Sequence, residues 1–89
     1  MSMKHKSGYV LREIGGVHYA IAVGAAAAEQ PGMIRLNETG AFLWSLLDRE
    51  TTVAELAAAL AGHASIELAQ AATDASDFTE RLKGAGLLD

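Results

Sequence analysis

The chain has 89 residues, of which 51% are hydrophobic, and it contains no cysteine. This length fits one domain with a small core, and the absence of cysteine excludes disulfides, thiolate catalysis and cysteine-based zinc sites. The formal net charge is −4, and most acidic residues follow Leu36, which disfavours binding to a phosphate backbone. No run approaches the roughly 18 apolar residues of a membrane helix, and no signal region follows the basic start, so a cytoplasmic location is expected.

Two strands joined by a tight turn are predicted in the first quarter of the chain. Residues 1–7 are expected to form a flexible tail, and residues 8–89 a single domain. Tyr9–Ile14 and Val17–Val23 have strand composition, and the intervening Gly15-Gly16 suits the positive φ angles of a hairpin turn. In Val17–Val23 bulky side chains alternate with small or polar ones, which indicates a strand with two different faces.

A loop and a short third strand are predicted next. Gly24–Gly32 is interpreted as a loop with room for one helical turn, because its alanines favour helix whereas Gln30-Pro31-Gly32 is a turn signal. Met33–Leu36 is predicted to be the third strand, leading directly into a helix that begins at Asn37. Asn37 suits an N-cap, because its side-chain oxygen accepts an amide of the first turn.

The remainder of the chain predicts three helices. The first ends near Leu47, and the second begins where Thr52 and Glu55 form a capping-box pattern. Gly62 is the expected C-cap of the second helix.

The third helix is predicted to start near Ser65 and to end at Gly84 and Gly86. Its apolar residues recur at spacings of three and four, which is typical of a helix with one buried face. Leu87 and Leu88 are then expected to fold back onto the core. Three short antiparallel strands followed by three helices predict an α+β domain of the winged helix-turn-helix type.

Catalytic and metal-binding chemistry finds little support in the residues. His5, His18 and His63 lack metal-ligand spacing, so no metal or cofactor is expected. Asp74, Asp77 and Glu80 recur every three residues, which is more typical of a solvated helix face than of an acid–base pair. No serine lies in a nucleophile motif. We therefore expect a protein that is not an enzyme, and we expect Trp44 to lie in the core.

The order of these signals resembles the PqqD family of small peptide chaperones. The resemblance extends from about Gly8 to the C-terminus. Its matching pieces are Leu36-Asn37-Glu38-Thr39-Gly40, Trp44 with Leu46-Leu47-Asp48, Thr52-Val53-Ala54-Glu55-Leu56, Asp74, Phe78, Leu82 and Gly86-Leu87-Leu88. The opening of the chain is more similar to stand-alone homologues in other peptide pathways than to the protein of pyrroloquinoline quinone (coenzyme PQQ) synthesis.

The resemblance implies the winged helix-turn-helix fold and a role as a recognition element in the biosynthesis of ribosomally made, modified peptides (RiPPs). Family members bind the leader segment of a precursor peptide as an added β-strand. They present it to a modifying enzyme, often a radical S-adenosylmethionine (radical SAM) enzyme, or to a leader peptidase in lasso-peptide pathways.

Carried over residue by residue, the resemblance implies a peptide-binding site between the third strand and the third helix. Ile34 and Arg35 are the strand residues best placed to meet the leader, and Arg35 and Arg81 are candidates for contacting its acidic residues. Phe78 fits the groove and the core equally well. The full implied set is Met33, Ile34, Arg35, Leu36, Ala71, Asp74, Phe78 and Arg81.

Two other classes of protein remain open at this stage. A winged-helix DNA-binding protein is one, although the acidic residues of the third helix argue against it. A structural module that forms a homodimer through its strand edge is the other. The sequence does not identify the precursor peptide, the enzyme served or the oligomeric state.

Overall fold

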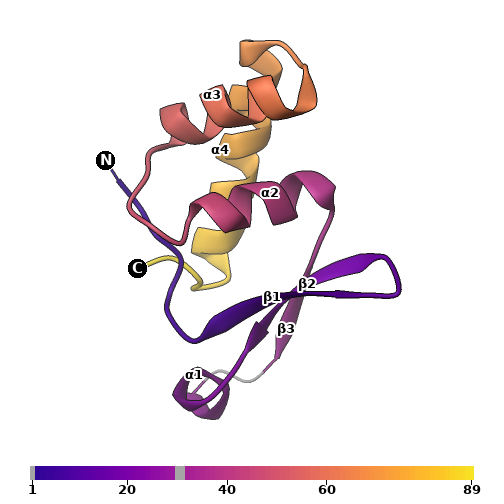
Figure 1. Cartoon of the computed structure of the whole chain (residues 1–89). Helices are drawn as coiled ribbons and strands as arrows, with labels where there is room; N and C mark the ends of the chain where they lie inside the picture. The colour runs from indigo at the N-terminus through magenta and orange to yellow at the C-terminus, as the bar shows by residue number, and fades with distance from the viewer. Residues whose placement is uncertain (1, 30–31) are drawn as a thin grey trace.

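The computed structural model describes residues 2–29 and 32–89, and it places a three-stranded sheet beneath a group of helices (Figure 1). The elements in chain order are β1 (Tyr9–Ile14), β2 (Val17–Ala22), α1 (Ala25–Glu29), β3 (Met33–Leu36), α2 (Glu38–Leu46), α3 (Val53–Ala64) and α4 (Leu68–Gly84). The predicted α+β class is confirmed, with three antiparallel strands that precede the main helices. No described helix is long and apolar enough to cross a membrane.

The sheet is built from a hairpin and one further strand. Its order is β1-β2-β3, and both pairings are antiparallel. Gly15 and Gly16 have φ angles of 59° and 82°, the left-handed values that the predicted two-residue turn requires. The helical turn allowed in Gly24–Gly32 is present as α1, whereas Gln30 and Pro31 of the predicted turn lie outside the described residues.

In β2 the small side chains are buried and the bulky ones are more exposed. Ala20 and Ala22 face the helices and are 0% and 8% exposed. Because neighbouring strand residues point to opposite faces, Tyr19 and Ile21 lie on the side away from the core, where they are only half-buried. Small inward residues let the helices approach the sheet closely, and Trp44 of α2 lies in the core as predicted, with 2% exposure and in the same cluster as Ala20.

The helices bury a leucine-rich core between α2, α3 and α4. Five of these leucines have less than 2% exposure: Leu43, Leu47, Leu56, Leu60 and Leu82. Ala71 and Ala75 are fully buried along α4, so α3 and α4 can pack closely over small side chains.

The start of the second predicted helix is confirmed, but its end is not. Thr52 Oγ1 accepts the Glu55 amide at 3.1 Å and a Glu55 carboxylate oxygen accepts the Thr52 amide at 3.1 Å, completing the capping box. Gly62 lies inside α3, and Ser65 is the C-cap, with a left-handed φ of 55°. The prediction of Gly62 as C-cap was therefore wrong. An exposed glycine lowers helix stability by only about 1 kcal/mol, so the helix can continue past it.

The end of the chain folds back as predicted. Helix α4 begins at Leu68, slightly later than expected, and Gly86 reverses the chain with a φ of 74°. The Leu87 amide donates to the Leu82 carbonyl at 2.9 Å, and the Leu87 side chain is 5% exposed.

The N-terminal segment, expected to be a flexible tail, is instead paired with the rest of the protein. Met3 and Thr51 exchange two backbone hydrogen bonds of 2.6 and 2.9 Å, and the Lys6 amide donates to the Leu87 carbonyl at 2.8 Å. The His5 ring stacks on Trp44, with centroids 4.4 Å apart. These contacts satisfy main-chain groups of two loops distant in sequence, which a local composition signal does not reveal.

Candidate functional site

An open sheet edge lies along β3. The Ala22 amide donates to the Gly32 carbonyl at 3.2 Å, and hydrogen-bonded pairs alternate along an antiparallel ladder. Ile34 and Leu36 therefore direct their peptide groups toward β2, because each lies an even number of residues from Gly32. Met33 and Arg35 direct their N–H and C=O groups away from the sheet, toward the free edge.

Arg81 spans the space between this edge and α4. Its Nη2 atom donates to the Arg35 carbonyl at 2.8 Å, although the two residues are 46 positions apart. The contact agrees with the register, because only a carbonyl directed to the free edge is within reach of α4. One wall of a groove is thus the strand edge, and the other is the face of α4 that carries Arg81.

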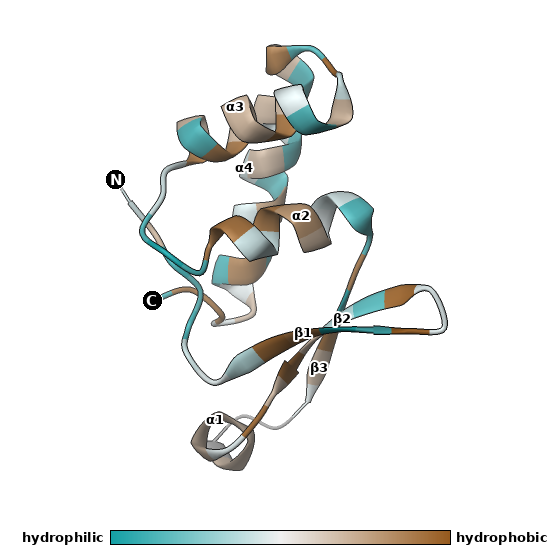
Figure 2. Cartoon of the chain, viewed as in Figure 1, coloured by the Kyte–Doolittle hydropathy of each residue, from teal (hydrophilic) through white to brown (hydrophobic). Residues whose placement is uncertain are grey.

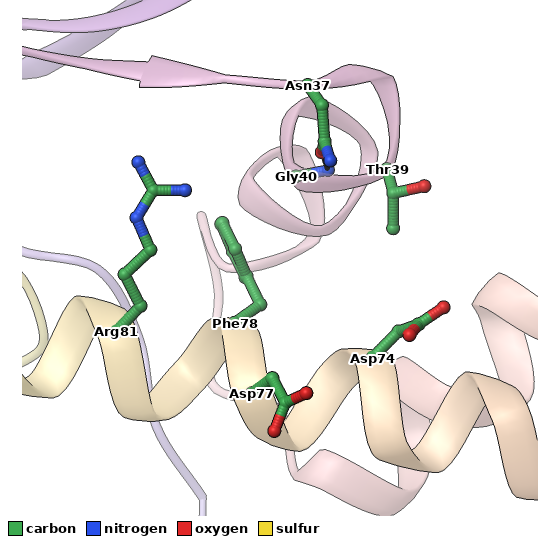
Figure 3. Close-up of a pocket in the computed structure, with 7 residues that line it drawn as sticks. All are labelled: Asn37, Thr39, Gly40, Asp74, Asp77, Phe78 and Arg81. Carbon is green, nitrogen blue, oxygen red and sulfur yellow. Dashed lines mark hydrogen bonds between the residues drawn. The ribbon is translucent and has the colours of Figure 1, made fainter.

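The groove contains a cavity of about 200 Å³ where it meets the first turn of α2. Figure 3 shows Phe78 and Arg81 extending from α4 toward the β3–α2 corner. The lining residues are Asn37, Thr39, Gly40, Asp74, Asp77, Phe78 and Arg81.

The corner between β3 and α2 is shaped by two small features of the sequence. Asn37 Oδ1 accepts the Gly40 amide at 2.7 Å and so begins α2 as predicted. A Cβ atom at Gly40 would lie 3.2 Å from Cε1 of Phe78 and 3.2 Å from Asn37 Oδ1. Glycine at this position therefore lets the Phe78 ring pass close over the start of the helix.

Charges of both signs lie along the groove. Asp74 is half-buried and accepts a hydrogen bond from Gln70 Nε2 at 2.8 Å, and Asp77 is exposed one turn further along α4. Arg81 follows Asp74 by seven helical positions, a rise of about 10 Å. The α2 end of the groove is therefore acidic, and the end beside Arg35 is basic.

The predicted site residues fall into two groups. Arg35, Asp74, Phe78 and Arg81 meet at the groove, where Phe78 combines 8% exposure with a place in the core cluster. The side chains of the others lie outside the cavity: the Met33 side chain is exposed, although its peptide groups face the free edge, the Ile34 side chain packs against the core, and Leu36 and Ala71 are buried.

Four lining residues were not among those expected: Asn37, Thr39, Gly40 and Asp77. The first three belong to the Leu36–Gly40 motif. This motif forms the corner between β3 and α2, and the same corner borders the cavity. Asp77 follows Asp74 by three positions, so it shares a helix face with it. This spacing was visible in the sequence as a solvated stripe.

The histidines contribute packing. His63 stacks on Phe42, with ring centroids 3.9 Å apart, and His5 stacks on Trp44. Within residues 2–29 and 32–89, no three His, Asp or Glu side chains gather in a way that could hold a metal ion. What the groove offers is main-chain groups of Met33 and Arg35 that face the free edge, one of them held by Arg81, beside a helical wall that carries the buried Phe78 ring.

Comparison with known proteins gives one family and one solved structure. Residues 24–88 match the family model described as "Coenzyme PQQ synthesis protein D (PqqD)". A structure described as "TbiB1 in Complex with the TbiA(beta) Leader Peptide" aligns with a TM-score of 0.72 and 21% identity, covering 97% of this chain and 94% of that chain. This likeness is one of fold. The search of curated proteins finds no match.

Proposed function

The chain belongs to the PqqD family, and on this premise we propose that it binds the leader segment of a ribosomally made precursor peptide without catalysing a reaction itself. The leader pairs as an added strand with the free edge of β3 and lies against α4. The observation that carries the proposal is the outward direction of the Met33 and Arg35 peptide groups beside the α4 wall. A solved structure of the same fold, whose title names a bound leader peptide, supports it.

The groove also suggests how the leader is selected. Main-chain pairing gives affinity that depends little on sequence, and side-chain pockets add specificity. The Arg81 guanidinium donates a hydrogen bond to the Arg35 carbonyl at 2.8 Å. A leader strand that pairs with this carbonyl therefore displaces the guanidinium. The released guanidinium and the Arg35 side chain then contact acidic residues of the leader, whereas Asp74 and Asp77 contact basic ones.

The bound leader delivers the remainder of the precursor to an enzyme. Holding the precursor beside the enzyme raises its effective concentration there without any chemistry by this chain. The enzyme classes we propose as partners are radical SAM enzymes and leader peptidases.

The direct test is a titration of ¹⁵N-labelled protein with a synthetic leader from a short precursor gene encoded beside this chain. We expect NMR shifts concentrated in β3 and α4, and a shuffled peptide of the same composition should need a higher concentration to produce them. Shifts confined to other elements, or their complete absence, would overturn the proposal. If β3 signals shift when the protein is diluted without peptide, the protein instead forms a dimer paired through β3.

A matched pair of variants isolates the main-chain contribution. Arg35→Pro removes an amide that faces the free edge, so it removes no β2–β3 hydrogen bond, and edge strands tolerate proline. Arg35→Ala removes the same side chain but keeps the amide. We expect Arg35→Pro to bind the leader about tenfold more weakly than Arg35→Ala, or about 1.4 kcal/mol, and equal affinities would contradict strand addition.

A further inference from the structure

The sheet face that points away from α2, α3 and α4 is a second candidate surface, here called the outer face. Residues opposite each other in neighbouring strands share a face, and Ala20 marks the inner one by its complete burial. The strand register then assigns eight residues to the outer face: Val10, Arg12, Ile14, Val17, Tyr19, Ile21, Met33 and Arg35. Figure 2 shows both brown and teal segments along β1, so apolar and charged residues both occur on this strand.

The outer face has an ordered pattern. Its central row is Arg12–Tyr19–Arg35, which lie in register across the sheet. Neighbouring strands are about 4.8 Å apart. The backbones of Arg12 and Arg35, two strands apart with Tyr19 between them, are therefore separated by about 10 Å. Apolar rows lie on both sides, Val10–Ile21–Met33 on one and Ile14–Val17 on the other.

This surface is accessible and lies outside the core. Ile14 and Met33 are 57% and 59% exposed. Val10, Val17, Tyr19 and Ile21 are half-buried by their neighbours in the sheet, and none of them belongs to the apolar residues packed against the core cluster. Apolar side chains that are exposed or half-buried therefore flank the polar central row, and accessible apolar area rimmed by polar residues is typical of an interaction site.

We propose that the outer face docks a partner protein whose contact surface carries carboxylates among apolar side chains. The apolar rows require an apolar partner surface. The strand residues that form the face include two guanidinium groups and no carboxylate, so the complementary charge must come from the partner. Tyrosine and arginine at the centre of a patch are the residue types that contribute most to protein–protein binding.

Other occupants fit the charges less well. A second copy placed face to face would bring arginine rows together and supply no acid, which is unfavourable. An anionic membrane gains only about 1 kcal/mol per cation, and this face has two cations on a chain with a net charge of −4. A protein with paired acids is therefore the occupant that satisfies both the apolar rows and the arginines.

The outer face meets the groove at β3, because Met33 and Arg35 belong to both. A leader strand added at that edge would place every second side chain on the outer face. A partner docked there contacts the chain and the leader together; this joint contact rests on the proposed function. Arg12 and Ile14 lie on β1, at the opposite side of the sheet, so substitutions there separate docking from leader binding.

The test places a photo-crosslinking benzoylphenylalanine at Tyr19 of the full chain, expressed in its native cells. We expect an adduct with one protein whose crosslinked region contains Asp or Glu beside apolar residues. Arg12→Glu should lower the adduct yield at least tenfold, and reversing the partner's carboxylate to lysine should restore it. Ile14→Ser, a second outer-face variant, should also lower it, whereas Arg49→Glu, an exposed arginine outside the sheet, should not.

Several results would overturn the docking proposal: an adduct only with a second copy, an adduct only with lipid, no adduct, or an adduct unaffected by Arg12→Glu. Leader titration of the Arg12→Glu protein separates the two proposals and checks its folding. Unchanged leader binding with a lost adduct supports separate surfaces. If the parent protein gives the adduct but binds no leader, the proposed function is refuted and the docking surface stands.

Discussion

The inner and outer faces of β2 differ in a way that reverses the usual relation between side-chain size and burial. The inner face of β2 presents alanines, and these are buried beneath Trp44 and the helices. The outer face presents valine, tyrosine and isoleucine, and these remain half-buried or exposed. Size therefore does not decide which face of β2 is covered; the closeness of the helices does, and the bulky face of this strand is left available for contact.

The largest expected effect concerns the two aromatic residues on either side of the sheet. Trp44→Ala should destabilise the protein by about 3–5 kcal/mol, because it opens a cavity above Ala20. Tyr19→Ala should cost about 1 kcal/mol or less, as a partly exposed site. Urea unfolding followed by far-UV circular dichroism measures both, and equal losses would refute the difference between the faces.

The next effect concerns added bulk on one face or the other. Ala20→Leu should destabilise the protein by about 1–3 kcal/mol, because the fully buried site has no room for a larger side chain. Ile21→Leu, the adjacent outer-face position, is the matched control and should change stability by less than about 1 kcal/mol. The comparison fails if Ala20→Leu unfolds at the same urea concentration as the parent protein.

A smaller effect tests the cover that the N-terminal segment gives to Trp44. His5→Ala removes the ring stacked at 4.4 Å and should cost about 1 kcal/mol, within the range for aromatic pairs. Lys6→Ala, an exposed neighbour, should have an effect below about 0.5 kcal/mol. Chemical denaturation measures the free energy of unfolding of both variants. If His5→Ala leaves it unchanged, the stacking on Trp44 does not stabilise the fold.

The smallest effect is expected at the rim of the outer face. Met33→Ser removes an apolar side chain that is 59% exposed and should change the free energy of unfolding by less than about 0.5 kcal/mol. A loss above 1 kcal/mol would mean that the outer face contributes to the isolated fold. Thermal and urea unfolding should agree on this variant.

Local signals in the sequence predicted much of the fold. The Gly15-Gly16 turn, the Asn37 cap and the Thr52–Glu55 capping box each depend on residues within three positions, and each is present in the structure. The error at the end of α3 arose because more than one residue there suits a helix C-cap. Gly62 and Ser65 both suit a helix end, and the packing of α3 decides in favour of Ser65.

The site was less accessible to sequence reasoning, because it depends on register and on contacts between distant elements. The third strand was predicted, but not which of its residues direct peptide groups to the edge; a hydrogen bond between Ala22 and Gly32 determines that. The Arg81–Arg35 contact joins residues 46 positions apart. Ile34 was expected to meet a ligand, yet its side chain packs inward.

The pairing of the N-terminal segment with the end of the chain has a practical consequence. The Lys4 carbonyl accepts a hydrogen bond from the Asp89 amide at 2.8 Å, and His5 pairs with Leu88, so the N-terminal segment lies next to the end of the chain (Figure 1). Neighbouring ends favour circular permutation and insertion into a host loop. A short linker could therefore close this fold into a ring, or graft it whole onto another polypeptide, without disturbing its interior.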